Sequence, residues 1–134
     1  SYIGGDLSEL REILARLGWP RQIGICLDSC HLFAAGHDLT TAEGIDQFVE
    51  KLDDSLGLDR VKMIHLNDSR KELGSHADRH AKLGQGALGV EGIAMVINHP
   101  ALRDLPFILE TPVDNYDEYK EEIRLARQLC RVRR

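Results

Sequence analysis

The sequence lacks the long apolar runs that a membrane span requires, and it has few cysteines. No apolar stretch approaches the roughly 20 residues that cross a bilayer. The 134 residues include only three cysteines, Cys26, Cys30 and Cys130. An odd count without a framework of spacings argues against a disulfide scaffold. We therefore expect packed thiols and a reducing compartment, the cytoplasm.

Clustered positive charge is also scarce. The formal net charge is −5, which taken alone argues mildly against a nucleic-acid binder, because such proteins usually carry a basic patch. The one basic cluster, CRVRR, follows an expected helix, where positive charge suits the helix macrodipole. The length suits one modest domain, and no linker, low-complexity segment or repeat divides it.

Helical and strand patterns alternate along the chain. Apolar spacing predicts helices over 6–18, 41–57, 90–100 and about 116–130, and strands over 23–27, 60–66 and 106–110. Capping boxes are expected at Asp6 with Glu9 and at Thr40 with Glu43. Strands that alternate with helices indicate an α/β fold with a parallel sheet. The pattern fits an open doubly wound sheet, or about half of a TIM (β/α)8 barrel, since a whole barrel takes about 250 residues.

Each expected strand ends on a potential metal ligand. The first ends at Asp28, the second at His65 and the third at Glu110. In parallel sheets the C-terminal edge is where ligands and active sites lie. A single carboxylate there is often a cap or turn residue, but three such strand ends predict a shared site.

More side chains of the ligand type stand close to these strand ends in the sequence. His31 follows Asp28 in DSCH, and DRH places Asp78 and His80 two residues apart, on one side of an extended segment. Three carboxylates and three imidazoles suit Zn²⁺, with Mn²⁺ or Fe²⁺ also possible, and six ligands imply at least two ions.

Other polar residues in these segments have simpler explanations. His37, His76 and His99 are assigned no role, and Asp68 is interpreted as a loop or cap residue. Arg70 and Arg79 are either phosphate contacts or solvated charges. The glycines of GQGALG either let backbone approach a phosphate or form a flexible turn.

Three segments resemble one known family. GICLDSCHLFAAGHD, HLNDSRKELGSHADRHAKLGQGALG and FILETP are similar to the C-terminal half of endonuclease IV, over roughly 24–112. The resemblance implies that residues 1–134 form a single segment of a zinc-dependent (β/α)8 barrel whose N-terminal strands are absent. That family cuts the phosphodiester 5′ to abasic sites in double-stranded DNA during base excision repair, leaving a 3′-hydroxyl and a 5′-deoxyribose phosphate.

The resemblance also implies roles for individual residues. Asp28, His65 and Glu110 would help to hold one zinc and act in catalysis through it. His31, Asp78 and His80 would hold another, and Arg79 would lie near the DNA backbone, with Arg70 as a further DNA contact. The family uses three zinc ions, of which this chain supports at most two, because the remaining ligands come from earlier strands.

Two alternatives stay open. Strand-end Asp, His and Glu also suit a metal-dependent sugar isomerase or epimerase on a related barrel. The chain alone is otherwise a non-catalytic half-barrel, whose two unpaired sheet edges invite pairing with another copy. We expect the isolated chain to self-associate or to need its N-terminal half. We also expect it to keep the His31, Asp78 and His80 site but to have little or no nuclease activity.

Overall fold

A three-stranded parallel sheet runs through the middle of the structure. A computed structural model describes residues 3–131, so the last three residues of the basic CRVRR cluster lie outside the described residues. The strands are β1 (Ile25–Asp28), β2 (Val61–His65) and β5 (Phe107–Ile108), in the order β1–β2–β5. The expected alternation of helices with parallel strands is confirmed.

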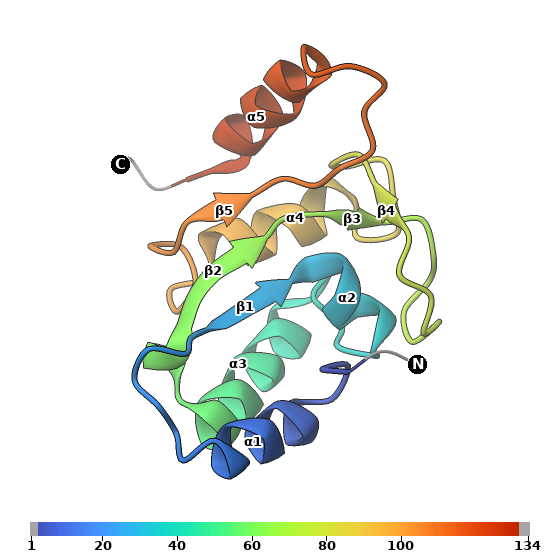
Figure 1. The fold of residues 1–134 in the computed structure, drawn as a ribbon. Helices are drawn as coiled ribbons and strands as arrows, with labels where there is room; N and C mark the ends of the chain where they lie inside the picture. Colours follow the sequence, from blue (N-terminus) through green and yellow to red (C-terminus); the bar gives the residue numbers. More distant parts are fainter. Residues whose placement is uncertain (1–2, 132–134) are drawn as a thin grey trace.

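The helices are α1 (Leu7–Arg16), α2 (Ser29–Ala34), α3 (Ala42–Leu56), α4 (Gly89–Asn98) and α5 (Glu118–Leu129), with a short 3-10 turn, η1 (Leu58–Arg60). Helices α3 and α4 cover one face of the sheet, α2 follows the end of β1, and α5 lies beyond the edge of β5 (Figure 1). Phe48 and Leu52 of α3 and Ile93 of α4 are fully buried against the strands. Burying each such side chain contributes about 1.5–3 kcal/mol. None of the helices within 3–131 is long and apolar enough to cross a membrane.

The helix ends follow from local hydrogen bonds. The carboxylate of Asp6 accepts from the backbone N–H of Ser8 at 2.9 Å and begins α1. For α3 the expected cap is displaced by one residue, because Thr41, rather than Thr40, accepts from the Gly44 N–H at 3.0 Å. Thr40 instead donates its hydroxyl to Asp38 at 2.6 Å. Gly57 ends α3 with a φ of +83°, a conformation that favours glycine.

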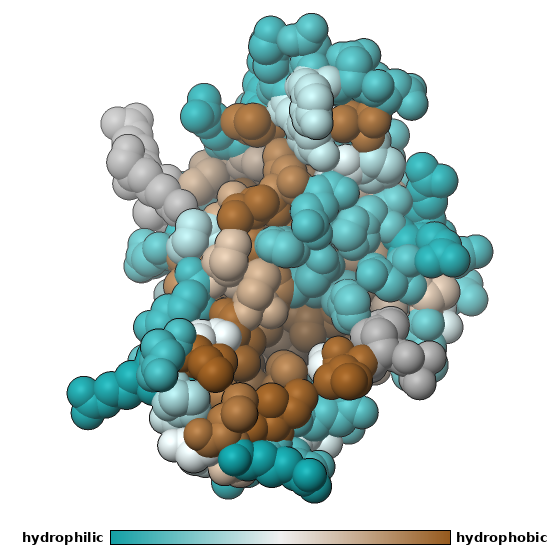
Figure 2. Space-filling view, in the orientation of Figure 1, coloured by the Kyte–Doolittle hydropathy of each residue, from teal (hydrophilic) through white to brown (hydrophobic). Residues whose placement is uncertain are grey.

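The other face of the sheet is open and largely apolar (Figure 2). Along β1, Ile25 and Leu27 are buried under the helices, whereas Cys26 points to the open face and is exposed. The prediction of a packed Cys26 thiol is therefore wrong, because the strand alternates between two faces of which only one is covered. Ile108 of β5 is likewise 42% exposed.

A short antiparallel pair follows β2 and was not predicted. It consists of β3 (Asp68–Ser69) and β4 (His80–Ala81), and the loop between them returns to α2. The Gly74 N–H donates to the Phe33 carbonyl at 3.0 Å, and the His76 N–H donates to the Ala34 carbonyl at 3.0 Å. The polar loop that follows β2 is therefore fastened in the middle as well as at its ends.

Candidate metal centre

The three strand ends meet at one edge of the sheet. The register pairs Asp28 with His65 and pairs His65 with Ile108, so these side chains share the open face. Glu110 lies two residues beyond Ile108 and has the same orientation. His65 Nδ1 lies 2.9 Å from Glu110 Oε2 and 3.9 Å from Asp28 Oδ2. Ligand atoms of these three residues lie within 4.8 Å of one another, the spacing of groups that hold one cation.

The second predicted ligand set, His31, Asp78 and His80, lies next to the first. His31 belongs to α2, Asp78 to the β3–β4 loop and His80 to β4. His31 Nδ1 lies 3.4 Å from Asp78 Oδ2, and His80 Nε2 lies 3.3 Å from Asp78 Oδ1. His80 Nε2 is also 3.5 Å from Asp28 Oδ2, so the Asp28 carboxylate faces an imidazole from each group. All six predicted ligands line one cavity of about 400 Å³.

The hydrogen bonds of His80 define which ring nitrogen is available to a cation. Nδ1 lies 3.2 Å from the Glu110 carbonyl oxygen, which can only accept, so this nitrogen carries the hydrogen. Nε2 then presents its lone pair to the cavity. A backbone carbonyl that fixes the tautomer of a histidine in this way is usual behind metal ligands.

Two buried atoms in this cavity face each other without a hydrogen bond. Within 3–131, Asp78 Oδ1 and His80 Nε2 lie 3.3 Å apart, and neither makes a hydrogen bond to any group. A buried acceptor left unsatisfied costs about 1–3 kcal/mol, and more when it is charged. A divalent cation would satisfy both atoms, and the set of three imidazoles and three carboxylates suits zinc. The residues present therefore fit a metal.

Cys30 lies beside this site as a buried thiol. Its sulfur is within 4.8 Å of ligand atoms of Asp28 and His80. Burial raises the pKa of the Cys30 thiol to about 11, so the group keeps its proton near neutral pH. The thiol points to the Arg79 carbonyl, with 3.6 Å between sulfur and oxygen. Cys30 is the packed thiol that the sequence predicts.

Arg70 and Arg79 stand at the rim of the site. They line a second hollow of about 350 Å³ that also contacts Asp78, His80 and Glu110. The Arg79 guanidinium donates to the Asp78 carbonyl at 2.8 Å, and the Arg70 N–H donates to the Arg79 carbonyl at 2.9 Å. Contact of these two cations with DNA stays a prediction.

The glycine-rich segment does not offer its amides to a phosphate. The N–H groups of Gly86 and Gly89 donate to Asp68 Oδ2 at 3.0 and 3.2 Å, and those of Ser69 and Leu88 donate to Oδ1 at 2.7 and 2.9 Å. Asp68 is fully buried, so it organises this loop from inside rather than capping an exposed turn. A sequence pattern does not reveal an acceptor of four backbone amides.

His37 and His99 have their contacts away from the cavity. His37 packs edge-on against Phe48, with ring centroids 4.8 Å apart. His99 pairs with Asp46 at 2.8 Å, and neither histidine lines the cavity. Asn67, which no sequence pattern singles out, donates its side-chain amide to Asp28 Oδ2 at 3.1 Å.

Comparisons with known proteins place the chain in a family. A family model described as xylose isomerase-like TIM barrel matches residues 1–129. A probable endonuclease 4 from Moorella thermoacetica is 58% identical over 128 residues, which cover 96% of this chain and 46% of that protein. A probable endonuclease 4 from Methanosphaera stadtmanae is 46% identical over 95% of this chain and 45% of its own length. The crystal structure of endonuclease IV from Thermus thermophilus superposes with a TM-score of 0.78 and 36% identity, covering 95% of this chain and 44% of that one.

These similarities decide between the two fold alternatives and test the resemblance to endonuclease IV. The chain spans about half the length of the curated relatives it matches. The resemblance to endonuclease IV is confirmed, and so is a fold of parallel β/α units that form part of a TIM barrel rather than an open doubly wound sheet.

Proposed function

The chain belongs to the xylose isomerase-like TIM barrel family, and from this premise we propose that it is the C-terminal half of a zinc-dependent endonuclease. The whole protein would hydrolyse the phosphodiester 5′ to abasic sites in DNA, as a step of base excision repair in the cytoplasm. The observation that carries the proposal is the convergence of six ligand side chains from three strand ends and one loop on a single cavity. The similarity to proteins named endonuclease 4 supports the choice of substrate.

The six side chains form two sets of ligands. Asp28, His65 and Glu110 would hold one ion, and His31, Asp78 and His80 would hold another. Bound zinc would supply Lewis-acid chemistry toward a phosphodiester. The Asp28 carboxylate faces both groups and therefore couples their occupancy.

Charge around the site also fits a phosphodiester once cations are bound. The chain has a formal net charge of −5, and three of its carboxylates lie in the cavity. Two divalent cations reverse that local sign, so an acidic chain can attract DNA. At the rim, Arg70 and Arg79 are positioned for the DNA backbone, where arginine binds phosphate as a bidentate donor.

The experiment on the whole protein uses a duplex with a single abasic site. The zinc-loaded full-length protein should cut it 5′ to the lesion and leave a 3′-hydroxyl, and an identical duplex with an intact base should stay uncut. His80→Ala should lose bound zinc and activity, whereas His76→Ala, in the same loop but outside the cavity, should keep both. A zinc-loaded protein that leaves the abasic duplex intact would refute the proposal.

A sugar isomerase or epimerase is the second candidate. The description of the matching family names an isomerase, and metal-held Asp, His and Glu side chains suit that chemistry as well. This candidate would be favoured if the full-length protein interconverts an aldose and a ketose and does not cut DNA that contains an abasic site.

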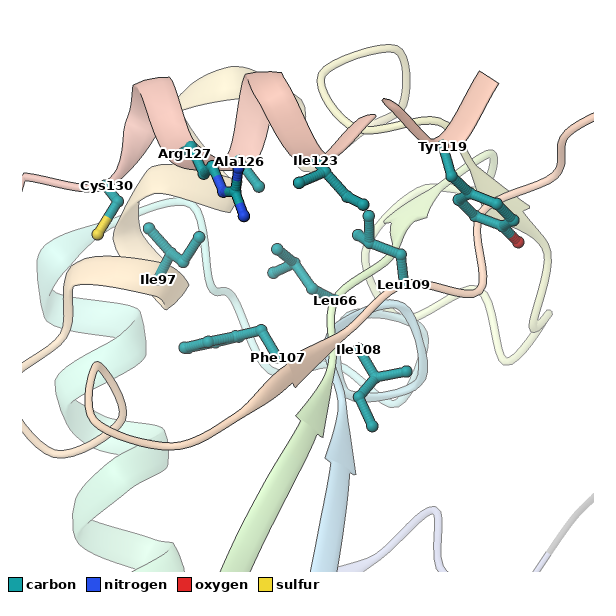
Figure 3. A pocket seen from close by; sticks show the side chains of 10 residues that line it. All are labelled: Leu66, Ile97, Phe107, Ile108, Leu109, Tyr119, Ile123, Ala126, Arg127 and Cys130. Atoms are coloured by element: carbon teal, nitrogen blue, oxygen red, sulfur yellow. The ribbon is translucent and has the colours of Figure 1, made fainter. Parts of the chain in front are cut away.

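An apolar groove supports the proposal that the chain is one half of a barrel. The groove has a volume of about 1000 Å³ and lies between α5 and the outer edge of β5. Figure 3 shows Leu66, Ile97 and Phe107 on one side of it and Ile123 of α5 on the other. Ile123 is 42% exposed there. We propose that the N-terminal half of the protein, or a second copy of this chain, covers this groove and the unpaired edge of β5.

The isolated chain, residues 1–134, tests the proposal that it is one half of a barrel. We expect this chain to self-associate in light scattering or to be only marginally stable, and to bind metal through His31, Asp78 and His80. It should cut abasic DNA little or not at all until the N-terminal half is added. A monodisperse monomer with a sharp thermal transition, or robust multiple-turnover cleavage by this chain alone, would contradict the proposal.

A further inference from the structure

Asn67 connects the three strands that carry the predicted ligands. It follows His65 by two residues, and its side chain reaches both neighbouring strands. Its Nδ2 donates to Asp28 Oδ2 at 3.1 Å, and its Oδ1 accepts from the Glu110 N–H at 3.0 Å. One amide group thus contacts the ligand at the end of β1 and the backbone of the ligand that follows β5.

The position of Asn67 is itself fixed. The residue is fully buried. The hydroxyl of Ser29, the first residue of α2, donates to the Asn67 carbonyl at 2.6 Å and accepts from the Asn67 N–H at 2.9 Å. Ser29 thus holds the backbone of Asn67, while the bonds at both ends of the buried side-chain amide, to Asp28 and from Glu110, set the orientation of that amide.

The bond to Asp28 bears on metal binding more directly than the bond to Glu110. Asp28 Oδ1 accepts from the His31 N–H at 3.1 Å, and Oδ2 accepts from Asn67. With one bond on each oxygen, the plane of the carboxylate is set from both sides. Oδ2 is also the atom that faces His65 and His80, so Asn67 aims the oxygen that stands between the two ligand groups.

We propose that Asn67 is a positioning residue that orients the Asp28 carboxylate, and through it the metal-binding geometry of both groups; this rests on the metal site of the proposed function. It does not touch the reacting atoms. Partners of this kind behind metal ligands typically change metal affinity by about 10- to 100-fold when they are removed.

The test measures zinc affinity in the full-length protein by competition with a chromogenic chelator. Asn67→Ala should bind zinc about 10- to 100-fold more weakly than the unmodified protein. Asn98→Ala is the control, because Asn98 also makes two partly buried side-chain bonds, to the Ala94 and Leu129 carbonyls at 2.8 Å, but joins α4 to α5 away from the cavity. Its zinc affinity should stay unchanged.

A double-mutant cycle distinguishes an effect of Asn67 on the orientation of Asp28 from an effect on the stability of the whole protein. If Asn67 acts through Asp28, adding Asn67→Ala to an Asp28→Ala protein should weaken zinc binding no further. The visible spectrum of the cobalt-substituted protein should also change in Asn67→Ala and not in Asn98→Ala. These readouts report ligand geometry and do not depend on nuclease activity.

Several results would overturn the inference. They are a zinc affinity of Asn67→Ala within twofold of the unmodified protein, an equal loss in Asn98→Ala, or additive losses in the cycle. Asn67→Leu, which keeps the number and branching of the side-chain heavy atoms but removes both polar groups, carries the test if the alanine variant does not fold. If both Asn67 variants fail to fold while Asn98→Ala folds, Asn67 serves the stability of the sheet as a whole, and the inference is wrong. An unmodified protein that binds no zinc would instead refute the proposed function.

Discussion

Replacing Asp68 by asparagine should destabilise the protein far more than its small chemical change suggests. Each carboxylate oxygen accepts two backbone N–H groups, Oδ1 from Ser69 and Leu88 and Oδ2 from Gly86 and Gly89. Asparagine keeps one oxygen and turns an NH₂ donor toward the other pair of donors. Two amides are then left buried without an acceptor.

The size of the effect follows from those two lost bonds. A hydrogen bond to a charged group contributes about 1.5–3 kcal/mol, and two of them give about 3–6 kcal/mol. Since changes above about 4–5 kcal/mol are exceptional for one substitution, we expect a loss of about 3–5 kcal/mol in the free energy of unfolding. Asp38→Asn is the matched control, because both bonds from Thr40 fall on the single atom Asp38 Oδ1, which the amide can retain. That variant should lose less than about 1 kcal/mol.

Urea unfolding of the metal-free full-length protein, followed by circular dichroism, gives both free energies. Hydrogen exchange should locate the damage, with faster exchange at the amides of Gly86, Leu88 and Gly89 in Asp68→Asn alone. The reasoning fails if Asp68→Asn is as mild as Asp38→Asn, or if those amides stay protected.

Three further changes have outcomes that the structure specifies. Gly86→Ala should lower the free energy of unfolding by about 1–3 kcal/mol, because a Cβ there would overlap the carbonyl of Ser69 and the carboxylate of Asp68; unchanged stability in urea would contradict this. Burial lowers the pKa of His37 from 6.5, so the unfolded chain binds the proton more readily and stability should fall as pH drops below 6.5. His37→Gln should flatten that part of the pH profile, and an identical slope would refute it. Cys30, buried and with a pKa raised to about 11, should react with a thiol reagent near neutral pH much more slowly than an exposed cysteine does, as mass spectrometry of the modified protein can show.

The parts of the fold that were predictable are those with strong periodicity and end signals. Helices α1 and α3 carry apolar residues at helical spacing and begin at side chains that accept a backbone N–H. The convergence of Asp28, His65 and Glu110 was predictable as well, because parallel strands bring their C-terminal ends to one edge. Helical spacing, helix ends and strand ends can all be recognised within short stretches of the sequence.

What escaped prediction depends on contacts between distant segments. Helix α2 has six residues and β3 and β4 have two each, too short for any period to appear. In α5, Ile123 lines an open groove, whereas Glu122 is buried and accepts from the Leu83 N–H at 3.0 Å, a contact that helical spacing alone does not indicate. The roles of Asn67 and Asp68 likewise depend on backbone groups from other parts of the chain.

The fastening of the β3–β4 loop to α2 has a consequence for insertions and deletions. Asp28 accepts from the N-terminal turn of α2, and the carbonyls of Phe33 and Ala34 near its other end receive the N–H groups of Gly74 and His76. Adding or removing one residue between 70 and 77 would shift one anchor relative to the other and carry Asp78 away from His31. The spacing between the anchors on α2 and the ligands Asp78 and His80 is therefore set by the length of this loop, and a homologous protein that keeps both ligands should keep that length.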